Sequence, residues 1–408
     1  MPNSSVDAPR LALVLSGGGA RAAYQVGVLQ ALARRLPELR FPILTGVSAG
    51  AINAAFLGAH GGGLPAAAEA LGGLWSHLRT RDVLVSDAAS LGRNVARWGA
   101  RLVTGGAHVT PTTRGLVDTR PLRELLEQTL LERSRRRDDA PGIPGVRRNL
   151  DAARLDALAV TTTNYSTGQS MTWVEAREFE PWYRPFRVGV GANVTVDHIL
   201  ASSALPLVFP AIRLGTHWHG DGGVRMTAPL SPALHLGAER ILVVATRRAR
   251  PRDIPESQLP EPYPPPAQIA GILMNAVFLD MLDYDAMNLD RVNELVRALP
   301  EEHRQGLRPV ELLVIRPSMD LARLSREYEH LLPASFRFLT RGWGTRDLAS
   351  PDTLSMLLFE AEYAKRLMEL GESDASARMD EIARFVRGSD GTYPPGPPGG
   401  RPGSGRAL

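Results

Sequence analysis

The sequence predicts an α/β protein built around a parallel sheet. Two short apolar runs, residues 11–15 and 41–47, each end in a turn rich in small residues, and helical patterns follow at residues 20–36 and 51–59. Continuous apolar runs of this length are typical of strands buried on both faces, as in a parallel sheet. The repeated order of strand, turn and helix indicates βαβ units.

The other elements are predicted from apolar periodicity and from proline and glycine at segment ends. Further strands are expected at residues 155–163, 169–174, 212–219, 241–246 and 310–315. Further helices are expected at residues 121–135, 196–204, 231–236 and 269–299, and beyond residue 317 the pattern is only helical. An arginine-rich segment at 133–150 and a proline-rich segment at 249–266 are expected to be loops.

The 408 residues suffice for two or three domains, or for one large α/β domain with additions. We expect a short N-terminal arm at residues 1–10, one α/β domain at 11–317 and a helical extension at 318–387. Residues 388–408 are mostly glycine, proline and serine, which predicts a disordered tail.

The composition excludes several classes of function. The chain has no cysteine, so disulfides, thiolate catalysis and cysteine-ligated metal sites are excluded. The net charge is only +4, which gives no indication of a nucleic-acid partner. No segment has the length and apolar character of a membrane span, and the first residues lack the pattern of a signal peptide. We therefore expect a cytoplasmic protein.

The first candidate for catalysis is Ser48, at the centre of the Gly-Val-Ser-Ala-Gly segment at residues 46–50. The pattern G-x-S-x-G between a strand and a helix exposes the serine hydroxyl on a strained turn, where Gly46 and Gly50 avoid steric clashes. The amino end of the next helix favours the negative charge that develops when a serine attacks an ester. A turn of small residues without chemistry is the alternative.

A second glycine-rich turn, Gly17, Gly18 and Gly19, also lies between a strand and a helix. Successive backbone amides at the start of a helix bind anions and would form an oxyanion hole. The rival interpretation is a dinucleotide-binding fingerprint, because residues 17–22 also fit G-x-G-x-x-A. That fingerprint requires an acidic residue at the end of the second strand, and this chain has the Ser48 turn there instead.

Asp221 begins a turn with Gly222 and Gly223 at the end of an expected strand. A serine nucleophile needs a base within hydrogen-bonding reach, and an aspartate can serve where partial desolvation raises its pKa from about 3.9. The structural alternative is an ordinary turn aspartate followed by two glycines.

Histidine offers two further arrangements. Ser48, Asp221 and His235 could form a triad, although His235 lies within an expected helix. His217, His219 and Asp221 alternate along one strand and could share a face as metal ligands. No other cluster of His, Asp or Glu in the sequence supports a metal site.

Three segments carry a resemblance: Leu-Ser-Gly-Gly-Gly-Ala-Arg-Ala-Ala-Tyr at 15–24, Gly-Val-Ser-Ala-Gly at 46–50 and Asp-Gly-Gly at 221–223. In this order they resemble the patatin-like phospholipase family, and the segments at 201–210, 229–238 and 269–293 are similar to it as well. The resemblance covers residues 10–315. It implies a three-layer α/β/α fold with a mostly parallel central sheet, and a C-terminal helical extension.

The resemblance implies a dyad in which Ser48 is the nucleophile and Asp221 its direct base. The amides of Gly17–Gly19 and of Arg21 would hold the oxyanion, and neither a metal nor an organic cofactor is needed. The implied activity is that of a serine lipid acyl hydrolase, of phospholipase A, lysophospholipase or esterase type, working through an acyl-enzyme.

Two positions depart from the family pattern. Ala22 stands where glycine is common, which the loop tolerates only if that residue needs neither a positive φ nor a close backbone neighbour. Thr227 stands where asparagine is common after the acid, and a hydroxyl offers fewer hydrogen bonds than an amide.

Two classes of function follow: hydrolysis of lipid acyl esters, and non-catalytic lipid binding or scaffolding on the same fold. The arginines of 133–148 could meet anionic head groups, and the apolar face at 269–281 could cover an acyl pocket or touch a membrane. A solvated loop and a core-packing helix are the alternatives for these segments. The expected partner is a lipid or ester substrate, and peripheral contact with a membrane is a further possibility.

Overall fold

The computed structural model describes residues 10–85, 115–131, 142–226, 228–248, 281–334 and 352–388, together with residues 92, 93, 96 and 337. Most of the expected N-terminal arm, the proline-rich segment, the first part of the expected helix at 269–299, Thr227 and the tail beyond residue 388 lie outside these residues. Within the described residues, no helix is both long and apolar enough to cross a bilayer.

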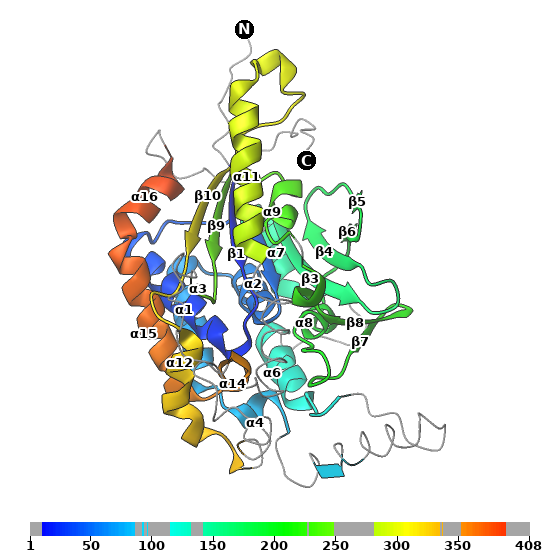
Figure 1. Cartoon of the computed structure of the whole chain (residues 1–408), viewed down its shortest axis with the longest axis vertical. Helices are drawn as coiled ribbons and strands as arrows, with labels where there is room; N and C mark the ends of the chain where they lie inside the picture. Colours follow the sequence, from blue (N-terminus) through cyan, green and yellow to red (C-terminus); the bar gives the residue numbers. More distant parts are fainter. Residues whose placement is uncertain are drawn as a thin grey trace, which may run out of the picture.

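In the described part of the chain, ten strands form one sheet at the centre of the molecule (Figure 1). The strands are β1 (Leu11–Leu15), β2 (Ile43–Val47), β3 (Ala157–Asn164), β4 (Ser170–Ala176), β5 (Trp182–Arg184), β6 (Arg187–Gly191), β7 (Ile212–Leu214), β8 (His217–Asp221), β9 (Arg240–Val244) and β10 (Glu311–Ile315). Eight strands follow the order β10-β9-β1-β2-β3-β4-β6-β5. The remaining two, β7 and β8, form a hairpin, and β8 pairs with β3. From β10 to β3 all neighbours are parallel.

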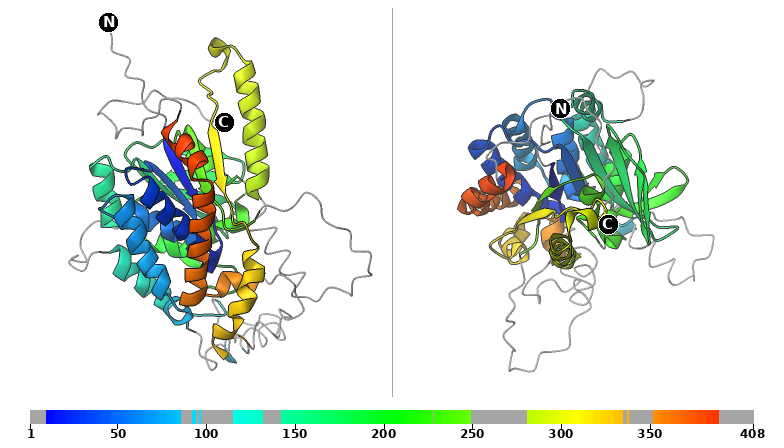
Figure 2. Two further views of the ribbon diagram at one scale, coloured as in Figure 1. Left: turned by 90° about the vertical axis from the view of Figure 1, so that its left-hand side faces the viewer. Right: turned by 90° about the horizontal axis from the view of Figure 1, so that it is seen from above.

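Helices cover both faces of this sheet (Figure 2). The α-helices are α1 (Ala23–Arg35), α2 (Ala49–Ala59), α3 (Leu64–His77), α4 (Thr80–Val83), α6 (Arg120–Leu130), α7 (Pro144–Asp151), α8 (Val196–Ser202), α9 (Ser231–His235), α11 (Met281–Ala298), α12 (Leu321–Ser325), α14 (Asp352–Leu357), α15 (Ala361–Ala377) and α16 (Met379–Arg387). Short 3-10 segments are η1 (Gly19–Ala22), η2 (Gly222–Arg225), η3 (Glu301–His303) and η4 (Arg326–Leu331).

The alternation of side chains along β1 defines the layers. Leu11, Leu13 and Leu15 belong to the larger core cluster, with residues of α1, α2, α3 and α15. Ala12 and Val14 point to the opposite face and join the cluster that includes residues of α9 and α11. The predicted three-layer α/β/α fold with a mostly parallel sheet is confirmed, as is a helical C-terminal region.

The expectation of one strand at 212–219 is wrong. The segment forms the β7–β8 hairpin, and Gly215, with a φ of 59°, lies in its turn. Glycine adopts this conformation without steric cost, so the chain reverses there instead of continuing. The consequence is that β8 runs antiparallel to β3 and ends at Asp221.

The expectation of an exposed loop over 133–150 is wrong for its second half. Residues 144–151 form α7, in which Val146 and Leu150 are buried. Arg147 donates a hydrogen bond to Asn193 (2.7 Å) and lies 3.5 Å from a carboxylate oxygen of Glu175. This arginine therefore contacts neighbouring protein side chains, and residues 132–141 lie outside the described part of the chain.

The C-terminal helix α15 packs directly on α1, and glycines permit the close approach. A Cβ on Gly27 of α1 would overlap the backbone of Met368, and a Cβ on Gly371 of α15 would overlap the carbonyl of Tyr24. Both helices contribute to the larger core cluster. The C-terminal region is thus bound to the segment that immediately follows the first glycine-rich turn.

We expect Gly27→Ala to lower the free energy of unfolding by about 1–3 kcal/mol, because the new methyl group must displace the backbone of α15. Gly73→Ala in α3 is the matched control: it is also a helical glycine, but a methyl group there would have no neighbouring atom within 4 Å. That substitution should raise the free energy of unfolding by about 0.8–1 kcal/mol. Urea denaturation followed by circular dichroism measures both, and equal effects would contradict the packing.

Candidate active site

The candidate site forms where two strands meet end to end along one edge of β3. The strand β2 ends at Val47 beside Thr161, and β8, running the opposite way, ends at Asp221 beside Thr162. Because β4 occupies the other edge of β3, β2 and β8 lie in line with their carboxyl ends facing each other. This arrangement brings Ser48, which follows β2, close to Asp221.

Ser48 occupies a strained turn between β2 and α2. Its φ of 56° and ψ of −133° lie where residues with a Cβ are rarely found. A Cβ on Gly46 or Gly50 would overlap neighbouring backbone, so both flanking glycines are needed. The Ser48 N–H donates to Ser202 Oγ (2.9 Å), and the Ser202 hydroxyl donates to the Thr161 carbonyl (2.7 Å). Ser202 therefore anchors the strained turn to both α8 and β3.

Asp221 is fully buried at the end of β8, and only one of its carboxyl oxygens is satisfied. Oδ1 accepts a hydrogen bond from the Gly223 N–H (2.8 Å), whereas Oδ2 has no hydrogen-bond partner of ordinary geometry among the described residues. Burial raises the pKa of the carboxyl to about 7, and the nearby Ser48 hydroxyl and the Gly223 amide oppose this rise. Gly222 permits the arrangement, since a Cβ there would overlap the Thr161 carbonyl.

The first glycine-rich turn lies directly beside the serine. A Cβ on Gly17 would lie 3.0 Å from the Cβ of Ser48, and Gly18 and Gly19 have φ values of 153° and 56°, which favour glycine. The amides of Gly17, Gly18 and Gly19 donate no hydrogen bond to any described residue. Unsatisfied amides at the start of a helix, next to a serine hydroxyl, suit the binding of an oxyanion.

Arg21 is held by the C-terminal region. Its side chain is 2% exposed, donates to Ser355 Oγ (2.6 Å) and to the Asp352 carbonyl (3.1 Å), and forms an ion pair with the Asp352 carboxylate. Its backbone N–H donates to the Gly18 carbonyl (3.2 Å), so this amide is not open to an oxyanion as the sequence led us to expect. Arg21 acts here as a positioning residue that fixes the turn.

The departure at Ala22 is compatible with the loop. Ala22 has a φ of −64° and a ψ of −13°, which are helical values that any residue adopts. Its carbonyl accepts a hydrogen bond from Asn53 Nδ2 (3.1 Å), and Asn53 Oδ1 accepts one from the Trp75 indole (2.9 Å). A glycine is therefore not required at this position.

The structure does not assemble the two arrangements that use histidine. The His235 ring lies 4.6 Å from the Trp182 ring, and its Nδ1 lies 2.9 Å from the Ser231 carbonyl. His219 is buried, with Nδ1 3.1 Å from Thr162 Oγ1, whereas His217 is exposed. In the part of the chain that the structure describes, no three His, Asp or Glu side chains are grouped to hold a metal ion.

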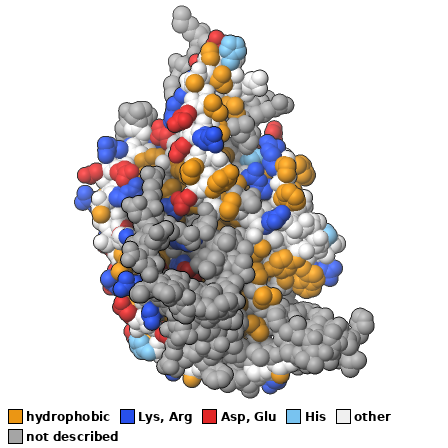
Figure 3. Space-filling model, in the orientation of Figure 1, with side chains coloured by type: hydrophobic (Ala, Val, Ile, Leu, Met, Phe, Trp, Pro, Cys, Tyr) orange, Lys and Arg blue, Asp and Glu red, His pale blue; other side chains and the backbone are white. Residues whose placement is uncertain are grey.

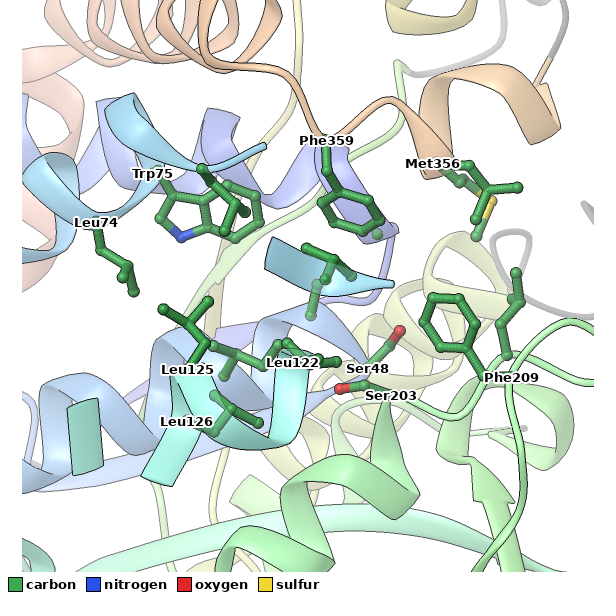
Figure 4. A pocket seen from close by; sticks show the side chains of 17 residues that line it. Ser48, Leu74, Trp75, Leu122, Leu125, Leu126, Ser203, Phe209, Met356 and Phe359 are labelled. Carbon is green, nitrogen blue, oxygen red and sulfur yellow. The ribbon is translucent and has the colours of Figure 1, made fainter. Parts of the chain in front are cut away.

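Ser48 opens on an apolar cavity with an empty volume of about 680 Å³, open solvent at its mouth included (Figure 4). The cavity is lined almost wholly by aliphatic and aromatic side chains: Ala49, Ile52, Leu74, Trp75, Leu78, Val83, Leu122, Leu125, Leu126, Leu205, Phe209, Met356, Leu357 and Phe359. Ser48 and Ser203 supply the hydroxyl groups in this lining. A cavity of this size and character suits an acyl chain.

A comparison of the sequence with models of protein families identifies the family of this chain. A family model described as patatin-like phospholipase matches residues 13–234, more than half of the chain. The chain belongs to the patatin-like phospholipase family. Among the curated proteins, none matches the chain.

Solved structures share distant likeness with this patatin-like phospholipase chain. Human GIVD cytosolic phospholipase A2, in complex with methyl gamma-linolenyl fluorophosphonate, is 14% identical with a TM-score of 0.43; the match covers 93% of this chain and 59% of that one. VipD from Legionella pneumophila is 16% identical, with a TM-score of 0.33 and coverages of 94% and 77%. The chain thus spans less than two thirds of the length of the phospholipase A2 chain, and likeness at these values carries no argument about activity.

The sequence motifs of this patatin-like chain did not reveal that C-terminal residues contribute to the site. Met356, Leu357 and Phe359 line the cavity, and a Cβ on Gly19 would overlap the Met356 carbonyl. Beyond residue 317 the sequence predicts only helices, and a helical pattern does not indicate which part of the protein the helix packs against. Only the fold shows that this segment closes the cavity beside the glycine-rich turn.

We expect Asp352→Asn to lower the free energy of unfolding by about 1–3 kcal/mol, because it leaves the buried Arg21 guanidinium without its anionic partner. The effect stays below that of a fully buried pair, since Asp352 is 21% exposed. Glu372→Gln, which breaks the exposed ion pair with Arg34 of α1, is the matched control and should cost less than about 1 kcal/mol. Denaturant titration of both variants tests this, and equal losses would argue against a positioning role for Arg21.

Proposed function

We propose that the chain is a serine lipid acyl hydrolase that cleaves acyl esters through Ser48 and Asp221. One observation carries the proposal: a serine on a strained turn lies beside a buried carboxyl with an unsatisfied oxygen, and the serine opens on an apolar cavity. An attacking serine needs a base, an anion-binding site and a place for the acyl group, and each has a candidate here.

In the proposed reaction, Asp221 accepts the hydroxyl proton as Ser48 Oγ attacks the ester carbonyl carbon. The carbonyl oxygen becomes an oxyanion that the amides of Gly17, Gly18 and Gly19 bind. The tetrahedral intermediate then collapses: the carbon–oxygen bond to the alcohol or lysolipid breaks, and the leaving oxygen takes the proton from Asp221. Water, deprotonated by Asp221, attacks the acyl-enzyme and releases the fatty acid together with free Ser48.

The pKa of Asp221 suits this role. A free aspartate is almost fully ionised at neutral pH and is a poor proton acceptor, whereas burial raises the pKa of Asp221 to about 7. A base with a pKa near the working pH is both largely available and reasonably strong. The proposed chemistry uses neither a metal ion nor an organic cofactor.

We extend the proposal to a cytoplasmic location with peripheral contact to a membrane. The membrane contact is supported by large apolar side chains that are exposed on α11, namely Tyr284, Met287 and Leu295. Figure 3 shows hydrophobic side chains over α11 and over the strands beside it, with both basic and acidic side chains among them. Exposed apolar and basic groups on one face favour contact with a lipid surface.

Ser48→Ala and Asp221→Asn should each abolish hydrolysis of a short p-nitrophenyl ester and of a mixed phospholipid panel, because each removes one partner of the proposed dyad. The wild-type protein should label with a fluorophosphonate probe, and Ser48→Ala should not. EDTA should leave the wild-type rate unchanged.

Asp285→Asn is the control, because Asp285 is a partly buried aspartate whose pKa is also raised by burial. It accepts a hydrogen bond from the Leu230 N–H and does not line the Ser48 cavity. It should keep wild-type turnover. If Ser48→Ala stays active, or if the wild type neither labels nor turns over, the hydrolase proposal is wrong and non-catalytic lipid binding in the apolar cavity takes its place.

Leu74→Trp should shorten the acyl chain that the cavity accepts. In Figure 4, Leu74 lies at the end of the cavity away from Ser48, so a larger side chain there should exclude long acyl groups and leave short ones unaffected. We expect kcat/KM for a dodecanoyl p-nitrophenyl ester to fall by about tenfold or more, with acetyl ester turnover retained. Equal effects on both esters would show that the acyl chain lies elsewhere.

A further inference from the structure

Ser203 is a buried hydroxyl that has no partner. Its side chain is 7% exposed, and its Oγ makes no hydrogen bond to any described residue. A buried polar group without a partner is unfavourable and rare in native structures, so each one calls for an explanation. Ser203 lines the apolar cavity together with Ser48 (Figure 4).

The preceding residue, Ser202, has a structural role, and its hydrogen bonds contrast with those of Ser203. Ser202 Oγ accepts from the Ser48 N–H (2.9 Å) and donates to the Thr161 carbonyl (2.7 Å), so its hydroxyl is fully used in joining α8 to the strained turn. That bond also fixes where the next residue lies relative to Ser48. Ser203 caps the carboxyl end of α8, where its N–H donates to the Ile199 carbonyl (3.0 Å), and its backbone is therefore held in place.

We propose that Ser203 is a further catalytic residue, which donates a hydrogen bond from its hydroxyl to the oxyanion that forms when Ser48 attacks the substrate. This inference rests on the proposed hydrolase function and adds a side-chain donor to the amides of Gly17–Gly19. Apart from Ser48 and Ser203, the side chains that line the cavity are apolar, and the Ser203 hydroxyl makes no hydrogen bond to any described residue. In this proposal, the hydroxyl of Ser203 gains its hydrogen-bond acceptor when an ester oxygen lies beside Ser48.

A donor of this kind strengthens as charge develops on the oxygen, and it therefore contributes mainly to the transition state. The apolar surroundings raise the value of such a hydrogen bond because little solvent screens it. The bond transfers no proton: the hydroxyl hydrogen of Ser203 stays on Ser203, and Asp221 alone carries the proton of Ser48. The role differs from that of Arg21, which acts through the shape of the turn.

The test compares Ser203→Ala, Ser203→Thr and Ser202→Ala with the wild type. The readouts are kcat and KM for a p-nitrophenyl ester, the rate of fluorophosphonate labelling at Ser48, and the denaturation midpoint. We expect Ser203→Ala to lower kcat by about 10²-fold with little change in KM, and to slow labelling in parallel. Its midpoint should stay the same or rise, because the substitution removes an unpaired buried hydroxyl.

The other two variants complete the comparison. Ser203→Thr keeps a hydroxyl and should recover most of the lost rate. Ser202→Ala removes two hydrogen bonds and should lower the midpoint, as a structural serine does.

Three results would overturn the assignment while leaving the hydrolase proposal intact: wild-type kcat in Ser203→Ala, a raised KM with unchanged kcat, or a rate loss that accompanies a lowered midpoint. An inactive wild type would instead refute the hydrolase function itself, and the role of Ser203 with it.

Discussion

The burial of the Asp221 carboxyl is the constraint on which the site depends. One oxygen is held by the Gly223 amide and the other lacks a partner among the described residues, so the ionised form is costly and the pKa rises to about 7. The pKa in the folded protein exceeds the ordinary value of 3.8, so protonation of Asp221 stabilises the folded state. This contribution to the free energy of unfolding is fully present below about pH 3.8 and is lost as the pH rises through about 7. The ionised state that the proposed reaction needs is therefore the less stable one, and the rest of the fold must compensate for it.

That compensation comes from segments that are far apart in the sequence. The β8 strand places Asp221 by pairing with β3, and Ser202 of α8 ties the Ser48 turn to the same strand. In the C-terminal region, Asp352 and Ser355 of α14 bind the Arg21 side chain, and the Met356 carbonyl lies close to Gly19. The C-terminal helices thus contact the glycine-rich turn and form part of the wall of the apolar cavity, which makes them part of the candidate site.

The sequence predicted the parts of the structure that local rules decide. The β1 and β2 strands, their glycine turns and the helices after them were expected because each carries its own periodicity and its own turn residues. Ser48, Asp221 and the glycine turns were recognised by motif, and the fold does bring them together. The hairpin at Gly215 was not predicted because a single glycine does not by itself mark the end of a strand in the sequence.

Other features escaped because they depend on long-range contacts. Arg21 is held in place by Asp352 and Ser355, and no local sequence pattern links these two residues to residue 21. The difference between Ser202 and Ser203 is equally invisible in the sequence, since two adjacent serines look alike until their partners are known. Tertiary contacts, and not residue types, assign these roles.

The most direct test of this account is the pH dependence of the reaction between Ser48 and a fluorophosphonate, followed as a labelling rate from about pH 4.5 to about pH 9. The probe has no titrating group, so the profile reports the base that activates the serine. The account predicts a rate that rises about tenfold per pH unit and levels off above a pKa near 7, the value for Asp221. A midpoint near that of a solvent-exposed aspartate, or a wild-type profile that persists in Asp221→Asn, would contradict the central claim that a buried Asp221 is the base.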